Sequence, residues 1–323
     1  MSIKPEPPYC LVTITDEEFS IATEVLLYSF LKFNSWFQGD LIVVEDGLPG
    51  HARDSLARLG SVQFCAPDRR LQQQIAALCA RVPKLKNVYK RFYSFEVFRM
   101  TGYRRAVYVD SDVYCAGPVD ALFTSSEPLL ACPDGFTYGD RIMGVLSDAR
   151  NGPPAPQVRY GRRFGRSFNA GVLSVGPPLL GEESYAALRR MLSFETWQAL
   201  GPSKFTDQMA LNIVFEDRFS PLAAIYNYMI FIEEYQKSCE GICSADARLV
   251  HFAGPLKPWN EYDPVALLEQ APQFARFIDV WRELLREVRA TRSLAELSST
   301  YHRQKDWIET FNRNPLLPKG RLY

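Results

Sequence analysis

Residues 106–113 read Ala-Val-Tyr-Val-Asp-Ser-Asp-Val, so four apolar residues with β-strand character run directly into two aspartates spaced by one residue. Ligands of open α/β sheets gather at the carboxyl ends of the strands. Two carboxylates at such an end can reach one cation, and their hard oxygens suit Mg²⁺ or Mn²⁺. The stretch predicts a strand that presents Asp110 and Asp112 to a divalent metal, although aspartates also end many strands as turn residues.

The residues before this stretch alternate between short apolar runs and segments with helical spacing. Strands are predicted at 10–15, 40–45, 61–65 and 106–109, and helices at 21–33, 52–59 and 88–100. Strands that alternate with helices favour a parallel sheet covered on both faces. The predicted fold class is α/β, with a Rossmann-like, mostly parallel central sheet.

After the two aspartates the pattern continues in a less regular form. Further strands are predicted at 128–132, 168–175 and 248–252, and further helices at 182–193, 206–215, 274–291 and 293–311. Residues 144–165, which contain many Arg, Gly and Pro, are predicted as a loop or lid. No repeat or linker divides the chain, so we expect one main domain at 1–262 and a helical C-terminal extension at 263–323 that packs on it.

Composition narrows the choice of partners and compartment. The chain has 323 residues, 47% of them hydrophobic, and its 37 basic residues equal its 37 acidic ones, so its overall charge predicts no attraction to nucleic acid. Its first residues lack the pattern of a secretory signal, and no stretch approaches the roughly 20 apolar residues of a membrane span. Seven scattered cysteines fit reduced thiols. We expect a cytoplasmic protein with, at most, peripheral contact at the cytoplasmic membrane face, and a homo-oligomer stays open.

A second segment with chemical potential, Leu-Val-His-Phe-Ala-Gly-Pro-Leu-Lys-Pro-Trp, occupies residues 249–259. It places His251, one of three histidines, at a predicted strand end, where the imidazole can complete a metal site with the aspartates. Gly254 lets the backbone approach a phosphate closely, and Lys257 can offset phosphate charge. The alternative is a surface loop with a packed His and Trp.

Two further segments combine small and polar residues with apolar ones: Ser-Phe-Asn-Ala-Gly-Val at 167–172 and Phe-Thr-Asp-Gln-Met-Ala-Leu-Asn at 205–212. Asn169 and Gln208 can hydrogen-bond to sugar hydroxyls, and Asp207 can stabilise positive charge that develops at a sugar. Taken singly, Asn169 equally fits a turn and Asp207 equally fits a helix N-cap.

In this order, the segments resemble glycosyltransferase family 8, the retaining enzymes of the glycogenin and lipopolysaccharide-galactosyltransferase type, which have the GT-A fold. The resemblance covers most of residues 9–260 and includes Val-Thr-x-Thr-Asp at 12–16. It implies that 1–262 is a nucleotide-sugar-binding catalytic domain that moves a hexose (glucose, galactose or N-acetylglucosamine) from a UDP-sugar to an acceptor hydroxyl. The acceptor, whether a glycan, a lipid-linked sugar or a small molecule, is left open.

The resemblance also implies roles for individual residues. Mn²⁺ (or Mg²⁺) is implied at Asp110, Asp112 and His251. The residues implied around the reacting sugar, as the catalytic set, are Asp207, Gln208 and Asn169. The residues implied to contact the UDP-sugar are Thr13, Ile14, Thr15, Asp16, Phe19, Arg91, Ser111, Ala170, Gly171, Gly254 and Lys257.

Two positions depart from the family pattern. Phe19 stands where a tyrosine is common, so stacking on the base can persist while a hydroxyl contact cannot. Ser94 stands where the family carries Lys or Arg on the helix before the aspartates, and Arg91, one turn earlier on the same face, can reach the same phosphate or sugar. These departures are the support for one alternative, a sugar-nucleotide-binding protein without turnover.

A second alternative is a phosphohydrolase of the haloacid-dehalogenase type, because those enzymes also use D-x-D-x-[TV] at a strand end, with the first aspartate as nucleophile. Such folds normally place the motif on their first strand and require a later Lys and acidic pair. Here a long stretch of α/β pattern precedes Asp110, and Thr-Asp-Gln at 206–208 is not such a pair.

Overall fold

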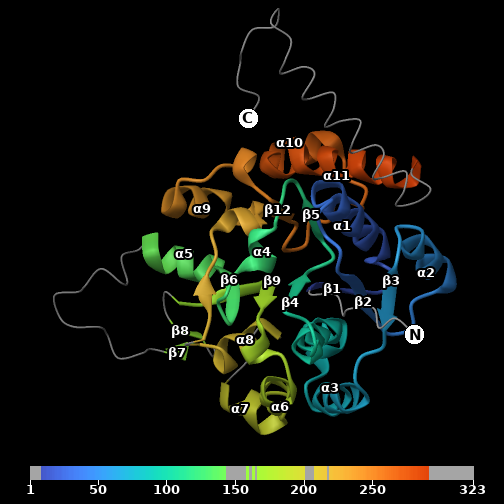
Figure 1. Cartoon of the computed structure of the whole chain (residues 1–323). Coiled ribbons are helices and arrows are strands. Elements are labelled where there is room, and N and C mark those ends of the chain that lie inside the picture. The colour runs from blue at the N-terminus through green and yellow to red at the C-terminus, as the bar shows by residue number, and fades with distance from the viewer. Residues whose placement is uncertain are drawn as a thin grey trace, which may run out of the picture.

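The computed structural model describes residues 9–142, 158–159, 162–163, 166–200, 207–216 and 218–290. Most of the predicted loop at 144–165, the helix predicted at 293–311 and the end of the chain lie outside the described residues. A seven-stranded sheet in the order β10-β6-β9-β4-β1-β2-β3 forms its centre (Figure 1). Its strands are β1 Tyr9–Thr15, β2 Asp40–Glu45, β3 Val62–Cys65, β4 Arg105–Val109, β6 Leu129–Pro133, β9 Phe168–Val175 and β10 Ser220–Pro221.

The predicted parallel arrangement is confirmed for the first four strands. β1 pairs in parallel with β2 and β4, and β2 pairs in parallel with β3. β9 is the exception, because it runs antiparallel to both β4 and β6. The sheet is therefore mostly parallel, with one reversed strand next to the strand that ends at the aspartates.

Helices cover both faces of the sheet, with α1 and α11 on one side and α3, α6 and α8 on the other (Figure 1). Side chains alternate accordingly along β1, where Leu11 enters the first core and Cys10 and Val12 enter the second. The α-helices are α1 Ser20–Phe33, α2 Gly50–Ala57, α3 Arg69–Arg81, α4 Ala121–Thr124, α5 Gly135–Ile142, α6 Glu182–Arg190, α7 Phe194–Leu200, α8 Asp207–Val214, α9 Glu233–Glu240, α10 Pro264–Gln270 and α11 Pro272–Ala290. Helix α3 was not predicted.

The helix predicted at 88–100 is a 3-10 helix, η2 Tyr89–Arg99. A 3-10 helix has three residues per turn, so side chains three positions apart lie above one another. Phe92, Phe95 and Phe98 follow this spacing, and all three are fully buried in the second core. The other 3-10 segments are η1 Pro83–Asn87, η4 Pro177–Leu179, η5 Ala224–Tyr226, η6 Ile230–Ile232 and η7 Ser244–Asp246.

Three short strands form a second sheet, in the order β11-β12-β5. They are β11 Tyr228–Met229, β12 Leu249–His251 and β5 Val113–Cys115. β5 begins directly after Asp112, so this sheet continues the chain from the end of β4. A third pair, β7 Val158–Arg159 and β8 Arg162–Arg163, is antiparallel.

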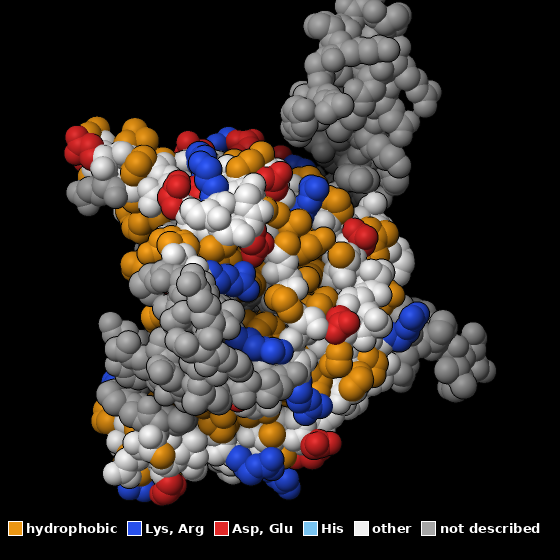
Figure 2. All heavy atoms as spheres, turned by 90° about the vertical axis from the view of Figure 1, so that its left-hand side faces the viewer, with side chains coloured by type: hydrophobic (Ala, Val, Ile, Leu, Met, Phe, Trp, Pro, Cys, Tyr) orange, Lys and Arg blue, Asp and Glu red, His pale blue; other side chains and the backbone are white. Residues whose placement is uncertain are grey.

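Helix α11 contributes to the same core as α1. Phe277 and Trp281 are buried in that core, and Glu287 accepts hydrogen bonds from Tyr28 and Lys32 of α1. Among the described residues, no helix combines the length and the apolar character that a membrane crossing needs. Basic and acidic side chains are interspersed on the face shown in Figure 2, so no surface of one charge sign dominates its described part.

Candidate metal and donor site

The two sheets meet at Asp110 and Asp112. β4 ends at Val109, and the backbone N–H of Asp110 donates to the carbonyl of Gly171 on β9 at 2.8 Å. β5 then pairs antiparallel with β12, with Val113 opposite His251, and the N–H of Phe252 donates to the carbonyl of Asp112 at 3.0 Å. The register of this pair places His251 against the aspartates.

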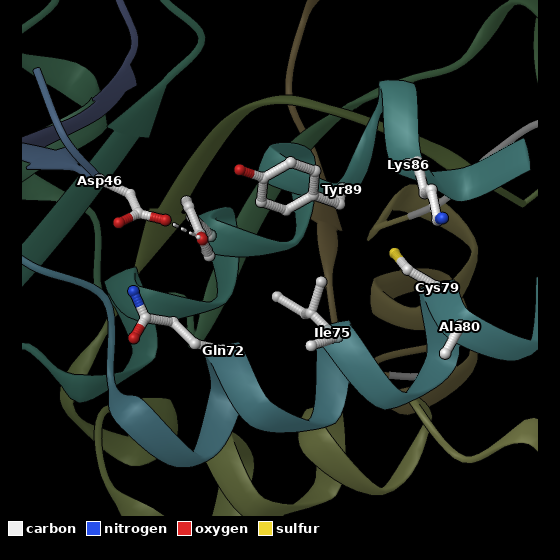
Figure 3. Close-up of a pocket in the computed structure, with 9 residues that line it drawn as sticks. Asp46, Gln72, Ile75, Cys79, Ala80, Lys86 and Tyr89 are labelled. Atoms are coloured by element: carbon white, nitrogen blue, oxygen red, sulfur yellow. Dashed lines mark hydrogen bonds between the residues drawn. The ribbon is translucent and has the colours of Figure 1, made fainter. Parts of the chain in front are cut away.

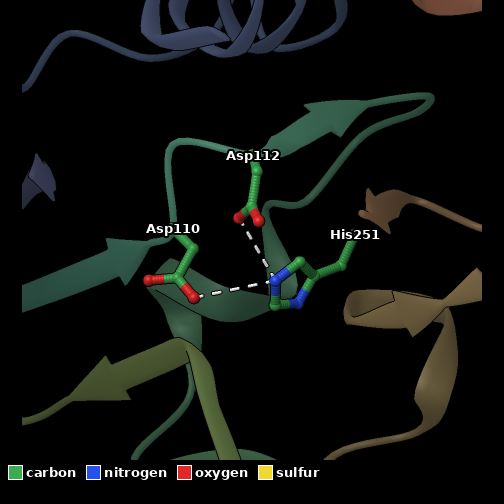
Figure 4. A group of neighbouring side chains, drawn as sticks. All are labelled: Asp110, Asp112 and His251. Atoms are coloured by element: carbon green, nitrogen blue, oxygen red, sulfur yellow. Dashed lines mark ion pairs between the residues drawn. The ribbon is translucent and has the colours of Figure 1, made fainter. Parts of the chain in front are cut away.

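Asp110, Asp112 and His251 form one cluster (Figure 4). Each offers a ligand atom, and these atoms lie within 4.8 Å of one another. The Nε2 atom of His251 is 3.2 Å from Asp112 Oδ1 and 3.6 Å from Asp110 Oδ2. Two carboxylate oxygens and one imidazole nitrogen are donors that Mn²⁺ accepts, so this donor set fits a divalent cation.

The two carboxyl groups have opposite shifts. Burial and the neighbouring charge of Asp112 raise the pKa of Asp110 above its usual value, although His251 and Tyr108 oppose the shift. Burial by itself would also raise the pKa of Asp112, but the charges of His251 and Lys257 outweigh it, and that pKa lies well below its usual range. Asp112 therefore stays ionised over a wide pH range, as a cation ligand must.

The loop after β12 brings a basic side chain to this cluster. Lys257 pairs with Asp112 through its Nζ atom, which also donates to the carbonyl of Phe252 at 2.8 Å. Gly254 has φ +99°, a conformation that glycine adopts without strain, and it turns the loop back toward the cluster. Lys257 thus lies where it can contact an anionic group bound beside Asp112.

The first loop meets the same region through Phe19. Its ring packs edge-on against Trp259, with centroids 5.0 Å apart, and lies 5.8 Å from Lys257 Nζ. Asp16 is half-buried, accepts from the Phe19 N–H at 2.9 Å and pairs with Lys90 at 3.1 Å. The segments predicted to contact the nucleotide and the diphosphate therefore lie side by side.

The rest of β1 is less accessible. The side chains of Thr13 and Thr15 are buried, and Thr15 Oγ1 accepts from Thr23 at 2.8 Å. The Thr13 hydroxyl has no hydrogen-bond partner among the described residues. Ile14 is half-buried and packs against the second core. Of residues 13–16, which were predicted to contact the UDP-sugar, only the Asp16 side chain and the backbone are therefore accessible.

Arg91 and Ser94 lie three residues apart in η2 and so occupy successive turns of this 3-10 helix. Arg91 is exposed, and its positive charge opposes the rise that burial and Asp112 cause in the pKa of Asp110. Ser94 is buried and donates to Asp207 Oδ2 at 3.2 Å. Arg91 thus provides a positive charge near the cluster, which the neutral side chain of Ser94 does not provide.

The residues predicted around the sugar also gather beside the cluster. Asn169 Nδ2 donates to Gln208 Oε1 at 3.1 Å, which joins β9 to α8, and Asp207 begins the same helix. Ala170 and Ser111 are both almost fully buried, so their backbone groups are what they can offer a ligand.

Gly171 permits a close approach to His251. A methyl group at this position would lie 2.8 Å from His251 Nδ1 and 2.9 Å from Asn169 Oδ1. Real Cβ atoms essentially never approach so closely. Glycine is therefore required between the sugar-side residues and the metal cluster.

Three polar residues of the site were not predicted from the sequence. Asn227, fully buried, lies 2.8 Å from His251 Nδ1 through its Oδ1 atom. Asp134, which follows β6, accepts from Gln208 Nε2 at 3.2 Å. Asn212 joins α8 to β9 by hydrogen bonds with both backbone groups of Phe168. Asp134 could have been found as a carboxylate at a strand end, whereas Asn227 carries no motif.

A pocket of about 460 Å³ lies between α3 and η2 (Figure 3). Tyr93 and Asp46, joined by a 2.9 Å hydrogen bond, form part of its wall, and Ile75, Cys79 and Lys86 form others. It contains no residue of the Asp110 cluster. The Asp110, Asp112 and His251 cluster therefore lies outside this pocket.

Comparisons with known proteins agree with this geometry. The sequence profile of "Glycosyl transferase family 8" matches residues 10–263. The chain is 30% identical to Glycosyltransferase GlyF of Streptococcus pneumoniae over 183 residues, which cover 56% of this chain and 39% of GlyF. It is 24% identical to galactinol synthase 3 of Arabidopsis thaliana, over 60% of this chain and 54% of that protein. The chain thus spans about half or less of the length of these relatives.

Solved structures show the same fold. The galactosyltransferase LgtC, solved with donor and acceptor sugar analogues, superposes with a TM-score of 0.62 over 86% of this chain and 95% of LgtC, at 16% identity. GlyE of Streptococcus pneumoniae superposes with a TM-score of 0.58 over 92% of this chain and 64% of GlyE, at 18% identity. The fold is GT-A.

The order of the motifs and the fold distinguish a glycosyltransferase from a phosphohydrolase. The aspartates follow the fourth strand of a GT-A sheet, and the family match extends over most of the chain, so the phosphohydrolase interpretation is not supported. The chain belongs to glycosyltransferase family 8.

Proposed function

We propose that the chain is a retaining, Mn²⁺-dependent hexosyltransferase that uses a UDP-sugar as donor. The observation that carries this proposal is the cluster of Asp110, Asp112 and His251 at the end of β4. A divalent cation held by these three residues would offset the charge of the diphosphate leaving group.

The chain's own cations would assist departure of the diphosphate. Lys257 lies against Asp112 and would contact phosphate oxygens beside the cluster, and the charge of Arg91, which acts on Asp110, would attract the same diphosphate. Phe19 would support the base from the first loop, with Asp16 beside it. Positive groups fixed in place before the reaction stabilise developing negative charge without reorganisation.

Asp207, Gln208 and Asn169 would surround the reacting sugar. Asp207 is almost fully buried near Ser94, and Gln208 is held between Asn169 and Asp134. A carboxylate and two amides in this position can orient sugar hydroxyls and stabilise positive charge at the anomeric carbon. Retention would then follow from attack on the face that the diphosphate leaves, with the departing oxygen accepting the acceptor's proton.

The remaining parts of the proposal concern organisation and location. We assign 1–262 as the catalytic domain and 263–323 as a helical extension, in keeping with the contacts between α11 and α1. A cytoplasmic location, peripheral to the membrane at most, fits the free thiols of all seven cysteines. The acceptor would be a glycan, a lipid-linked sugar or a small molecule, and a homo-oligomer is compatible with this assignment.

A donor screen tests the proposal. The purified chain is incubated with UDP-glucose, UDP-galactose, UDP-N-acetylglucosamine and GDP-sugars, each with Mn²⁺, Mg²⁺ or EDTA, and released nucleoside diphosphate is measured. We expect release from at least one UDP-hexose with Mn²⁺ and none with EDTA. Binding of a UDP-sugar without any hydrolysis would instead support a binding protein without turnover, and phosphatase activity on p-nitrophenyl phosphate alone would contradict the assignment.

A further inference from the structure

A continuous chain of side-chain hydrogen bonds runs from the metal cluster to the far side of the sugar site. His251 Nδ1 lies 2.8 Å from Asn227 Oδ1, and Asn227 Nδ2 donates to Asn169 Oδ1 at 2.8 Å. Asn169 Nδ2 then donates to Gln208 Oε1 at 3.1 Å, and Gln208 Nε2 donates to Asp134 Oδ2 at 3.2 Å. Three amides therefore connect an imidazole to a carboxylate.

Backbone N–H groups fix where the side-chain amides of Asn169 and Gln208 place their oxygen and their NH₂ group. The N–H of Gly171 donates to Asn169 Oδ1 at 2.9 Å, and the N–H of Ala170 donates to Gln208 Oε1 at 3.4 Å. A backbone N–H can only donate, so each of these amides must present its oxygen there. The carboxylate of Asp134 agrees with this direction, because it accepts from the remaining NH₂ group.

The same reasoning extends to the imidazole. Because Asn169 presents an oxygen, Asn227 must turn its NH₂ group toward it, which leaves the Asn227 oxygen facing His251 Nδ1. An amide oxygen can only accept, so Nδ1 must carry a hydrogen. Nε2 is the atom that faces Asp110 and Asp112, whose carboxylates also can only accept, so without a cation Nε2 carries a hydrogen as well. A bound cation would take the place of that hydrogen and leave Nδ1–H as the remaining one.

We propose that Asn227 is a positioning residue that transmits the hydrogen-bond direction of the sugar site to His251 and fixes its metal-binding tautomer. Its side chain is fully buried, and its backbone is held by Ala224 and Gln236 at 3.0 and 3.2 Å. Groups behind a metal-bound histidine commonly set ring orientation and tautomer in this way. The inference rests on the proposed function in one respect, which is that Asp110, Asp112 and His251 bind the divalent cation.

The tautomer can be measured without donor, with diamagnetic Mg²⁺ in place of Mn²⁺ at the cluster. Nitrogen-15 NMR of histidine-labelled protein distinguishes the two neutral tautomers, and replacing His51 and His302 by Gln leaves His251 as the sole signal among the three histidines. At alkaline pH we expect the Nδ1–H form in this background. In Asn227→Leu, which offers no acceptor, we expect the Nε2–H form or a mixture. An Nε2–H signal from the background protein itself would overturn the inference.

Mn²⁺ binding, measured by calorimetry, gives the second readout. Asn227→Leu should weaken Mn²⁺ binding by about 10- to 100-fold. Asn227→Asp keeps an acceptor for Nδ1–H but cannot donate to Asn169, so we expect unchanged tautomer and Mn²⁺ affinity within about threefold, with kcat for donor hydrolysis at least about tenfold lower. Asn34→Asp makes the same change at a buried asparagine outside the cluster and should alter neither tautomer nor Mn²⁺ affinity.

The outcomes separate this inference from the proposed function. If the wild-type chain binds Mn²⁺ and hydrolyses donor, but Asn227→Leu keeps the tautomer and the affinity, the inference fails while the function stands. If the wild-type chain binds neither Mn²⁺ nor Mg²⁺, the function fails and the inference fails with it. Should Asn227→Leu not fold, the Asn227→Asp variant decides alone. If this variant loses both the Nδ1–H tautomer of His251 and the Mn²⁺ affinity, the role of Asn227 is merely structural.

Discussion

Gly171 lies directly beneath the imidazole of His251, so that a methyl group at this position would lie 2.8 Å from Nδ1. Gly171→Ala should push the ring away from Asp110 and Asp112 and weaken Mn²⁺ binding by about tenfold or more. Calorimetry of Mn²⁺ binding checks this. Gly50→Ala is the control, because a methyl group there meets nothing within 4 Å. Equal affinities in the two variants would show that the ring is not confined by Gly171.

Asp112 is the carboxylate that faces both His251 and Lys257. Asp112→Asn removes the charge and keeps the volume, so we expect the circular dichroism spectrum to persist while Mn²⁺-dependent donor hydrolysis falls by about 100-fold or more. Asp279→Asn makes the same change at an exposed carboxylate of α11 and should leave turnover unchanged. Turnover near the wild-type level in Asp112→Asn would remove Asp112 from the site.

Lys257 is the cation in direct contact with the cluster. Lys257→Met keeps much of the side-chain length but removes the charge, so kcat for donor hydrolysis should fall by about 100-fold if Lys257 stabilises the leaving group. Steady-state release of nucleoside diphosphate measures it. Lys237→Met, at an exposed position of α9, provides the matched control. A rise in KM with kcat unchanged would instead limit Lys257 to ground-state binding.

Trp281 is buried to 99% where α11 packs on the main core, since only 1% of its surface is exposed. Trp281→Ala should lower the free energy of unfolding by about 3–5 kcal/mol, the usual cost of truncating a buried aromatic residue. Urea unfolding followed by circular dichroism measures the change. Val280→Ala, at an exposed position of the same helix, should change it by less than about 0.5 kcal/mol. A small effect in Trp281→Ala would make the extension separable from the catalytic domain.

Patterning alone predicted several of the elements that carry the site, although not β5 or β11. The apolar runs at β1, β2 and β4 and the helical spacing of α1 are local properties, and alternation of strands with helices favours a parallel sheet. The carboxyl ends of such strands share one edge, which is why the position of Asp110 and Asp112 could be predicted. The 3-10 geometry of η2 was missed, although the spacing of Phe92, Phe95 and Phe98 by three residues records it.

By itself, the sequence determined the α/β fold class and the residue types of the cluster, because strand and helix periodicity and the ligand preferences of hard cations depend on local pattern. Only the tertiary structure decided how His251 is held. The register of β5 against β12 places His251 beside the aspartates, and Asn227 contacts its Nδ1 atom from a segment with no motif. Such contacts depend on backbone groups that meet only after folding, so no pattern along the chain encodes them.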